Sequence, residues 1–220
     1  ELWQKAFLSC VYGIVDKEGH RQFREVMLLI ARKNGKSLIA SGIGKYHFEN
    51  GDEYGAKVYC LAPKLDQADI VYNNLWQMVL LDPDYQTKKA EIDAAKDRRE
   101  KPDDSDLQRH RMTDLYYPLI NSTVKKIAFS AKKSDGFNPS VAICDEIASW
   151  EGDKGLKQYA VMKSGQGSRE EPLLLSCTTS GYVNDSIFDN LMKRATRLLL
   201  GDSKETRFLP FLYMIDNVDK

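Results

Sequence analysis

The fold of this chain is decided by the stretch Ile30-Ala31-Arg32-Lys33-Asn34-Gly35-Lys36-Ser37. An apolar run leads into it, and the residues after Ser37 can form a helix. A strand, a loop ending in Gly-Lys-Ser and a helix form the layout of a phosphate-binding loop, in which backbone N–H groups and a helix N-terminus hold phosphates. Lys36 would reach the outer phosphates, and Ser37 would ligate Mg²⁺. Taken alone, the stretch fits a solvated turn equally well, because Ile30 stands where the usual first glycine would fall.

The composition narrows the classes of protein to consider. The chain has 220 residues, of which 32 are basic and 32 acidic, so its formal net charge is zero. This balance does not indicate a globally basic nucleic-acid binder, and any DNA contact must use a local patch or an assembled oligomer. No apolar run approaches the roughly 20 residues that span a bilayer, and no signal peptide is visible. Because the sequence begins at Glu1 without Met, we expect a domain of a longer protein.

The four cysteines do not suggest a metal centre. Cys10, Cys60, Cys144 and Cys177 are far apart in the sequence, and no histidine lies near them at ligand spacing. Three of them fall in apolar, strand-like runs. We therefore expect buried free thiols in a reducing compartment rather than disulfides or metal ligands.

Helical and strand-like segments alternate along the chain. Helices are predicted over 1–13, 36–48, 67–81 and from Asp185 or Ser186 to Leu200, and strands over 25–30, 57–62, 125–130, 141–146, 173–178 and 208–214. Several of the strands are continuously apolar, which is typical of a mostly parallel sheet with helices on both faces. Gly42 and Gly44 lower the helix propensity of 36–48, and we attribute them to close packing against the sheet.

The segment 86–114 has a different character, because it is rich in charged residues and has few apolar anchors. It predicts an exposed helix, a turn at 101–105 and a second helical piece. Such a segment is an insertion or lid, and it is either a solvated face or a contact for DNA or a partner protein.

Polar residues follow two of the buried strands. Asp145 and Glu146 end the strand 141–146, and Thr178 and Thr179 end the strand 173–178. In an open parallel sheet, ligands bind at the carboxyl ends of the strands. Asp145 could hold Mg²⁺ through its water shell, and Glu146 could orient and deprotonate a water for in-line attack on the γ-phosphate. An ordinary pair of strand-end acids is the alternative.

The order of these motifs favours the functional interpretation. A phosphate loop followed by an apolar strand ending in Asp-Glu predicts an α/β P-loop NTPase. The glutamate adjacent to the aspartate marks the additional-strand, catalytic-glutamate class rather than kinases or small GTPases. In this arrangement Ile30 is simply the last residue of the strand, and Arg32 and Lys33 add positive charge to a short loop.

The chain resembles the ATPase domain of the large terminase subunit of tailed phages and prophages. The motifs that carry the resemblance are Trp3-Gln4, Arg32–Ser37, Ala62-Pro63 with Gln67-Ala68, Asp135-Gly136 with Ile143–Glu146, Thr178–Gly181, and Leu200–Asp202 with Phe208–Tyr213 before Asp216. They occur in the order of the family over almost the whole chain. The charged segment 86–114 matches no motif of the family.

The resemblance implies roles for single residues. Gln4 would hydrogen-bond the adenine edge, and the alternative is an exposed helical glutamine. Arg32 would reach the γ-phosphate, or it pairs with a nearby acid. Thr178 and Thr179 would couple hydrolysis to motion, or they are ordinary strand-end hydroxyls. The catalytic set is Glu146, Lys36 and Arg32, the nucleotide-binding set is Gln4, Arg32, Lys33, Asn34, Gly35, Lys36 and Ser37, and the Mg²⁺ ligands are Ser37 and Asp145.

A packaging motor of this family also needs a basic residue donated by the neighbouring subunit. Lys132 and Lys133, shortly before the acidic strand, are the first candidates for this trans-acting role, and Arg109 and Arg111 are the next. For each of them a solvated surface position is the alternative.

The resemblance also implies a function for the domain as a whole. Residues 1–201 would form the ATPase domain, and 202–220 the last strand and the start of a linker to a nuclease domain that is absent here, so we expect no nuclease activity. The domain would hydrolyse ATP with Mg²⁺ to move double-stranded viral DNA into a procapsid. Its partners would be DNA, a homo-oligomeric ring on the capsid portal and the small terminase subunit, in the host-cell cytoplasm and without a membrane. The alternatives are a helicase-like DNA-dependent ATPase and a nucleotide-binding scaffold module that does not hydrolyse ATP.

Overall fold

The computed structural model describes residues 1–50, 53–128, 136–181 and 186–214. They form an α/β fold around one mixed sheet with the strand order β3-β4-β5-β2-β6-β7-β1-β8. The strands are β1 (Glu25–Ile30), β2 (Lys57–Ala62), β3 (Arg109–His110), β4 (Leu115–Tyr117), β5 (Ser122–Ala128), β6 (Val141–Cys144), β7 (Leu173–Thr178) and β8 (Phe208–Tyr213). In this order, the six strands β5, β2, β6, β7, β1 and β8 pair in parallel. The short strands β3 and β4 add an antiparallel edge.

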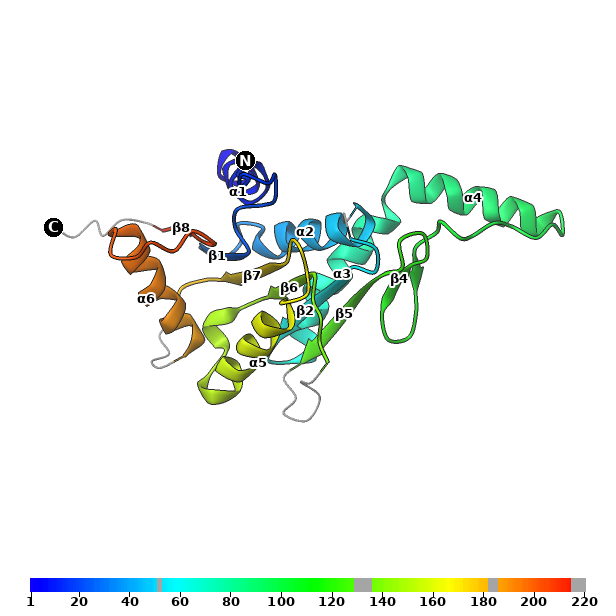
Figure 1. Ribbon diagram of the computed structural model, residues 1–220. Coiled ribbons are helices and arrows are strands. Elements are labelled where there is room, and N and C mark those ends of the chain that lie inside the picture. Colours follow the sequence, from blue (N-terminus) through cyan, green and yellow to red (C-terminus); the bar gives the residue numbers. More distant parts are fainter. Residues whose placement is uncertain (51–52, 129–135, 182–185, 215–220) are drawn as a thin grey trace.

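Helices cover both faces of the sheet, as the apolar strands predicted (Figure 1). One face carries α1 (Leu2–Gly13), α2 (Lys36–Asn50) and α3 (Leu65–Leu80), and the other carries α5 (Gly152–Gly165) and α6 (Ile187–Leu199). Successive residues of β1 point to opposite faces, so that Val26 and Leu28 join the first core and Met27 and Leu29 join the second. The mostly parallel, two-sided fold predicted from the sequence is confirmed.

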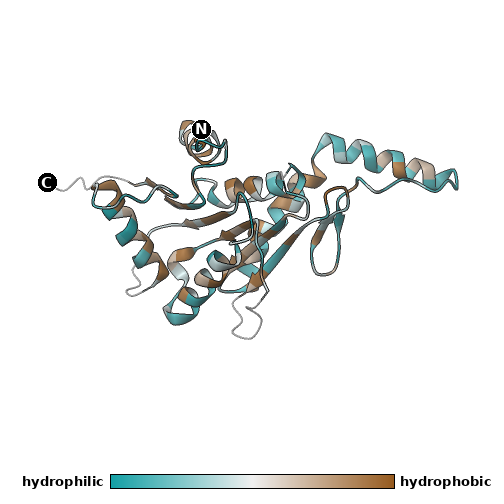
Figure 2. Cartoon of the chain, viewed as in Figure 1, coloured by the Kyte–Doolittle hydropathy of each residue, from teal (hydrophilic) through white to brown (hydrophobic). Residues whose placement is uncertain are grey.

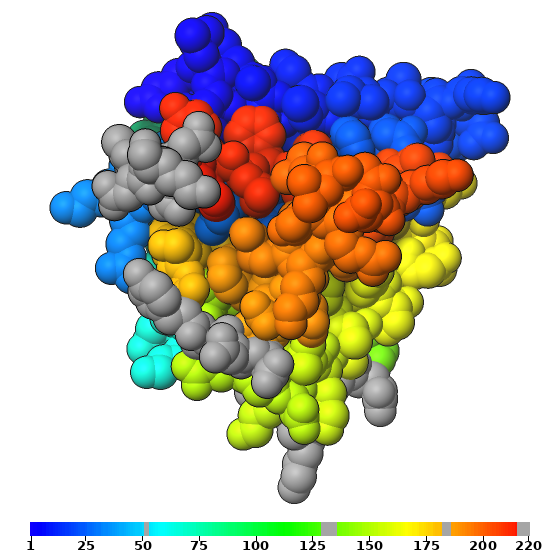
Figure 3. Space-filling view, turned by 90° about the vertical axis from the view of Figure 1, so that its left-hand side faces the viewer, coloured from blue at the N-terminus to red at the C-terminus, as the bar shows by residue number. Residues whose placement is uncertain are grey.

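The first and last elements of the fold pack on each other. Trp3 of α1 stacks on Tyr213 of β8 with the ring centroids 5.9 Å apart, and Phe7 meets Phe211 edge to face at 5.2 Å. β8 pairs with β1 along its whole length. Figure 3 shows this side of the molecule, with α1 in blue lying above β8 in red and α6 in orange. The N-terminal helix is thereby held close to the strand that leads into the phosphate loop.

The charged segment forms an arm that projects from the body of the molecule (Figure 1). Its helix is α4 (Pro83–Asp97), which begins at the N-cap Asp82 and is mostly hydrophilic, as Figure 2 shows. The predicted exposed helix is confirmed, but the prediction of a second helical piece was wrong. The chain instead returns through the antiparallel strands β3 and β4, where His110 packs against the rings of Tyr72 and Trp76 of α3. Tertiary contacts of this kind override a local preference.

One helix has no counterpart in the sequence prediction. α5 contains Gly152, Gly155 and Gly165, and its buried residues include the polar Gln158 beside Tyr159. This pattern gives a weak helical signal. Gly155 is required by packing, because a Cβ there would lie 2.7 Å from the carbonyl oxygen of Trp150.

The structure describes the surroundings of all four cysteines. Cys60, Cys144 and Cys177 are buried, Cys10 is half-buried, and all four are free thiols, as predicted. Burial raises the pKa of the three buried thiols well above the ordinary value. Among the described residues, every helix is too short or too polar to cross a membrane.

Candidate functional site

Three neighbouring strands bring the predicted motifs to one edge of the sheet. β6, β7 and β1 are adjacent and parallel, so their carboxyl ends open onto the same side. The phosphate loop follows β1, Asp145 and Glu146 follow β6, and Thr178 ends β7 between them. This is the edge where parallel sheets bind ligands. β7 lies between β1, which leads into the loop, and β6, which leads into the acids. A strand in this position agrees with the predicted additional-strand class of NTPase.

The loop between β1 and α2 is a compact turn. Asn34 donates hydrogen bonds from its side-chain amide to the carbonyls of Ala31 (3.1 Å) and Arg32 (3.2 Å). Lys33 and Gly35 both have positive φ, at 67° and 76°. The glycine is favoured because side chains rarely adopt this conformation. Ile30, at the position of the missing first glycine, is a buried residue of the strand.

Lys36 lies between the two acids. Its Nζ is 2.7 Å from Asp145 Oδ1 and 2.7 Å from Glu146 Oε1. The side chains of Lys36 and Asp145 are 8% and 5% exposed, whereas that of Glu146 is 39% exposed. Burial by itself would lower the pKa of Lys36, but the charge of Asp145 and the hydrogen bonds to both acids outweigh it and raise that pKa. The lysine therefore stays charged and offsets part of the negative charge of two acids that lie 109 and 110 residues away in the sequence.

Ser37 and Asp145 form an oxygen pair suited to Mg²⁺. Ser37 Oγ lies 3.4 Å from Asp145 Oδ2, the oxygen of that carboxylate not bound by Lys36. A hydroxyl and a carboxylate are oxygen ligands of the kind that Mg²⁺ takes in nucleotide sites. The residues present thus fit the ion that the sequence predicted.

The acidic strand ends earlier than predicted. β6 stops at Cys144, and Glu146 has left-handed backbone angles, with φ 51° and ψ 47°. A non-glycine residue in this region costs roughly 1–3 kcal/mol, so the surroundings must hold it there. The backbone then turns through the short 3₁₀ helix Ile147–Ser149. With this backbone, the side chains of both Asp145 and Glu146 lie 2.7 Å from Lys36 Nζ.

Thr178 connects β7 to that acidic turn. Its buried hydroxyl accepts a hydrogen bond from the Ala148 N–H (3.1 Å) and donates one to the Thr179 carbonyl (2.8 Å). Gly181 lies against the same turn, since a Cβ there would be 2.6 Å from Ala148 Cβ. Of the two predicted coupling residues, Thr178 is thus in direct contact with the segment that carries Glu146.

The remaining predicted nucleotide-binding residues surround the loop. The Gln4 amide nitrogen is 3.6 Å from where a Cβ on Gly35 would be, so α1 places Gln4 beside the loop. Arg32 and Lys33 are exposed, and neither forms an ion pair within the described part of the chain.

A cavity of about 630 Å³ opens next to the phosphate loop. It is lined by Leu29, Ile30, Ala31, Asn34, Ser180, Tyr213 and Met214. Ser180, Tyr213 and Met214 were not predicted as site residues. Only the pairing of β8 with β1 brings the end of β8 to the loop, and the aromatic run 208–213 was the one signal in the sequence.

Two of the four predicted trans-acting residues, Arg109 and Arg111, lie away from this edge. Arg109 pairs with Asp104 (3.0 Å), and Arg111 binds Asp114 through two nitrogens (2.6 and 3.0 Å). Both belong to the β3–β4 side, at the far end of the strand order from β1. Lys132 and Lys133 lie outside the described residues.

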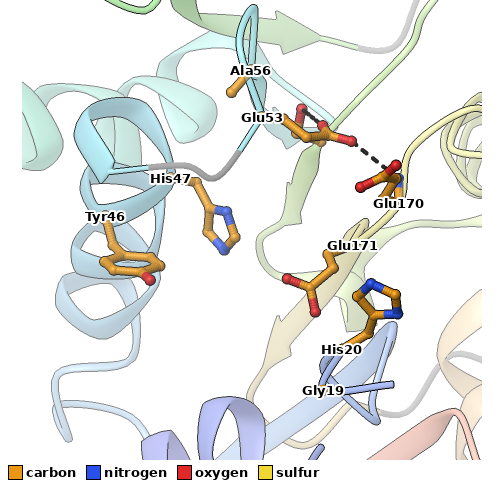
Figure 4. Close-up of a pocket in the computed structure, with 9 residues that line it drawn as sticks. Gly19, His20, Tyr46, His47, Glu53, Ala56, Glu170 and Glu171 are labelled. Carbon is orange, nitrogen blue, oxygen red and sulfur yellow. Dashed lines mark hydrogen bonds between the residues drawn. The ribbon is translucent and has the colours of Figure 1, made fainter. Parts of the chain in front are cut away.

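A second cavity, of about 330 Å³, lies at the opposite edge of the sheet (Figure 4). Its lining precedes the strands and includes Glu53, Glu170, Glu171 and His20. Carboxylates repel phosphates, so this cavity does not suit a nucleotide. His47 also lines it, and burial followed by the charge of Arg21 lowers its pKa to about 3.

Comparisons with known proteins show the family of the chain and proteins of similar fold. The family model described as "Terminase large subunit, ATPase domain" matches residues 2–197. The fold is similar to the large terminase of bacteriophage HK97, with a TM-score of 0.75 and 24% identity over 100% of this chain and 40% of that chain. It is also similar to the large terminase ATPase domain of Thermus phage P74-26, with a TM-score of 0.55 and 14% identity over 87% of this chain and 75% of that chain. No curated protein matches the sequence. The chain thus spans less than half of the HK97 protein.

Proposed function

Because this chain belongs to the family of terminase large subunit ATPase domains, we propose that it hydrolyses ATP with Mg²⁺ and thereby drives double-stranded viral DNA into a procapsid. Family membership supports a role in packaging and an ATPase activity. The proposal extends this to the residues that carry the reaction and to the partners of the motor. A homo-oligomeric ring at the capsid portal, the small terminase subunit and the host-cell cytoplasm belong to the same proposal.

One observation carries the proposal for the site. Lys36 lies 2.7 Å from both Asp145 and Glu146, at the carboxyl edge of the sheet and at the start of a helix. A lysine on a phosphate loop beside an aspartate and a glutamate is the set of groups that ATP hydrolysis requires, namely a cation for the phosphates, a metal ligand and a base. A second carboxylate would have no use in a module that only binds nucleotide.

Binding would start from the phosphate loop. The N-terminus of α2 and Lys36 would hold the phosphates, Arg32 would reach the terminal one, and Gln4 would contact the base from α1. Ser37 and Asp145 would hold Mg²⁺, which neutralises negative charge on the phosphates when bound.

Glu146 would act as the base. Its carboxylate is the more exposed of the two, which lets it meet a water at the terminal phosphate. Lys36 donates a hydrogen bond to this carboxylate. Incoming phosphates compete for the lysine, so their binding would release Glu146 for proton transfer. Thr178, bonded to Ala148 in the same turn, would transmit the change to β7.

Two substitutions test the assignment. Glu146→Gln removes the base but keeps the size of the side chain, so we expect ATP binding within about threefold of wild type and turnover at least about 100-fold lower. Lys36→Ala removes the phosphate contact, so ATP affinity should fall by about tenfold or more. Calorimetry with an ATP analogue and a phosphate-release assay with Mg²⁺ and DNA measure the two effects.

Glu151→Gln is the matched control, because Glu151 is an exposed acid at the N-cap of α5, close in sequence but outside the site. It should hydrolyse ATP like wild type. Wild-type turnover by the Glu146→Gln variant would refute the assigned base. Unchanged affinity in Lys36→Ala would refute the phosphate loop.

A further inference from the structure

We infer that Trp150 is a positioning residue, whose indole N–H fixes the peptide between Asp145 and Glu146 and so holds the Glu146 carboxylate at the site. This inference rests on the proposed role of Glu146 as the base. It adds a residue that acts through the backbone of the acidic turn and that the proposed function does not use.

The peptide bond between the two acids is held at both ends. Trp150 Nε1 donates a hydrogen bond of 2.9 Å to the Asp145 carbonyl. The N–H of the same peptide, which belongs to Glu146, donates to Asp145 Oδ1 at 3.0 Å. A peptide unit is planar, so fixing its oxygen and its N–H fixes the plane. The direction in which Glu146 leaves the backbone follows from that plane.

Trp150 is itself anchored in the core. It is fully buried among the residues between the sheet and the helices α5 and α6, in one cluster with Tyr159 and Met162. The helix α5 also packs closely on Trp150, because a Cβ on Gly155 would lie 2.7 Å from the Trp150 carbonyl oxygen. The indole therefore cannot follow the turn if the turn relaxes. It serves as a fixed point against which the turn is held.

The left-handed conformation of Glu146 explains why such a fixed point is needed. Residues with side chains disfavour φ near 51°, so an unrestrained peptide would rotate towards a commoner conformation. Asp145 is secured separately, because its N–H pairs with the Leu61 carbonyl at 3.0 Å. Losing the indole bond should thus move Glu146 while leaving Asp145, Lys36 and the phosphate loop in place.

Trp150→Phe tests this, since phenylalanine keeps an aromatic ring in the core and removes the donor. We expect turnover to fall about tenfold or more, with affinity for an ATP analogue within about threefold of wild type. Trp76→Phe is the matched control, because Trp76 lies on α3 against the β3–β4 hairpin. It should change neither quantity by more than about twofold.

A double variant separates positioning from simple core packing. If Trp150 acts only through Glu146, Trp150→Phe should lower turnover no further in the Glu146→Gln background. Additional loss there, or wild-type turnover in the single variant, would overturn the inference. Normal ATP binding together with a wild-type rate in Trp150→Phe would remove this inference alone, whereas an inactive wild-type protein would remove the proposed function.

A measurement on the wild-type protein covers the case in which Trp150→Phe does not fold. The chain has three tryptophans, so ¹⁵N spectra contain three indole signals that single Trp→Phe variants can assign. The Trp150 indole N–H should exchange with solvent more slowly than those of Trp3 and Trp76. Fast exchange of the Trp150 signal would contradict the hydrogen bond on which the inference depends.

Discussion

His47 is a buried imidazole on α2 whose surroundings keep it neutral. Its Nε2 lies 3.1 Å from the Tyr12 hydroxyl and 3.4 Å from Arg21 Nη1. Burial is the larger cause of its low pKa, and the Arg21 charge adds to it. The acidic pair at the other edge of the sheet is different, because Lys36 supplies a counter-charge there. Single residues thus show two ways of burying an ionisable group, by pairing it and by keeping it neutral.

This neutral histidine predicts a loss of stability in mild acid. Its pKa is lowered from 6.5 to about 3 in the folded chain, so below about pH 6.5 the unfolded chain binds a proton that the folded chain does not. The stabilisation is complete above that pH and is lost as the pH falls towards 3. We expect the free energy of unfolding to drop by about 2 kcal/mol between about pH 7 and 5.

Urea unfolding at several pH values measures this dependence. His47→Gln should remove most of the slope, and His110→Gln, at an exposed position on β3, should retain it. The same slope in both variants would show that His47 is not the group responsible. The low pKa of Glu25, about 2, arises because Arg194, Lys163 and Tyr159 together outweigh its burial, and this carboxylate affects stability only below about pH 4.5.

The two glycines of α2, Gly42 and Gly44, differ in how closely their surroundings are packed. A Cβ on Gly44 would lie 2.8 Å from Leu75 Cδ1 and 3.1 Å from Ile143 Cδ1, so close packing explains this glycine, as predicted. A Cβ on Gly42 would meet nothing within 4 Å. The prediction of close packing was therefore wrong for Gly42.

The two glycines should respond in opposite ways to alanine. Gly42→Ala should stabilise the chain by about 0.5–1 kcal/mol, because glycine in a helix interior costs that much relative to alanine. Gly44→Ala should destabilise it by roughly 1–2 kcal/mol, because the buried side chains of Leu75 and Ile143 must move. Chemical denaturation of both variants measures the difference, and effects of the same sign would contradict this account of α2.

For the whole molecule, the missing part of the proposed site is the basic group from a neighbouring subunit. Arg109 and Arg111 are engaged by acids of their own chain, which leaves Lys132 and Lys133 as the first choice for this role. We expect the variant with alanine at both lysines to bind ATP normally and to lose most DNA-stimulated turnover. The variant with alanine at Arg109 and Arg111 should keep at least half of that turnover.

Mixing subunits tests whether the lysines act across an interface. Neither Glu146→Gln subunits nor subunits lacking both lysines should turn over ATP efficiently. In a mixed ring, an intact Glu146 on one subunit can meet intact lysines on its neighbour, so activity should reappear. A mixture as inactive as its components would show that the lysines act within their own chain or not at all.

The sequence by itself determined the parts of this protein that depend on local pattern. Continuous apolar strands set the parallel sheet, the Gly-Lys-Ser triplet placed the loop before α2, and the order of loop and Asp-Glu pair predicted the class of NTPase. These features were readable because strand and loop signals lie within a few neighbouring residues. The exposed character of α4 was readable for the same reason.

Only the tertiary structure decided how distant residues meet. It placed Lys36 between two acids more than 100 residues away, set Glu146 in a left-handed turn held by Trp150, and brought Tyr213 to the phosphate loop through the pairing of β8 with β1. It also replaced the second helical piece with a hairpin against α3 and formed α5 around Gly155. These outcomes depend on which surfaces pack together in three dimensions, and the periodicity of a segment carries no information about its distant neighbours.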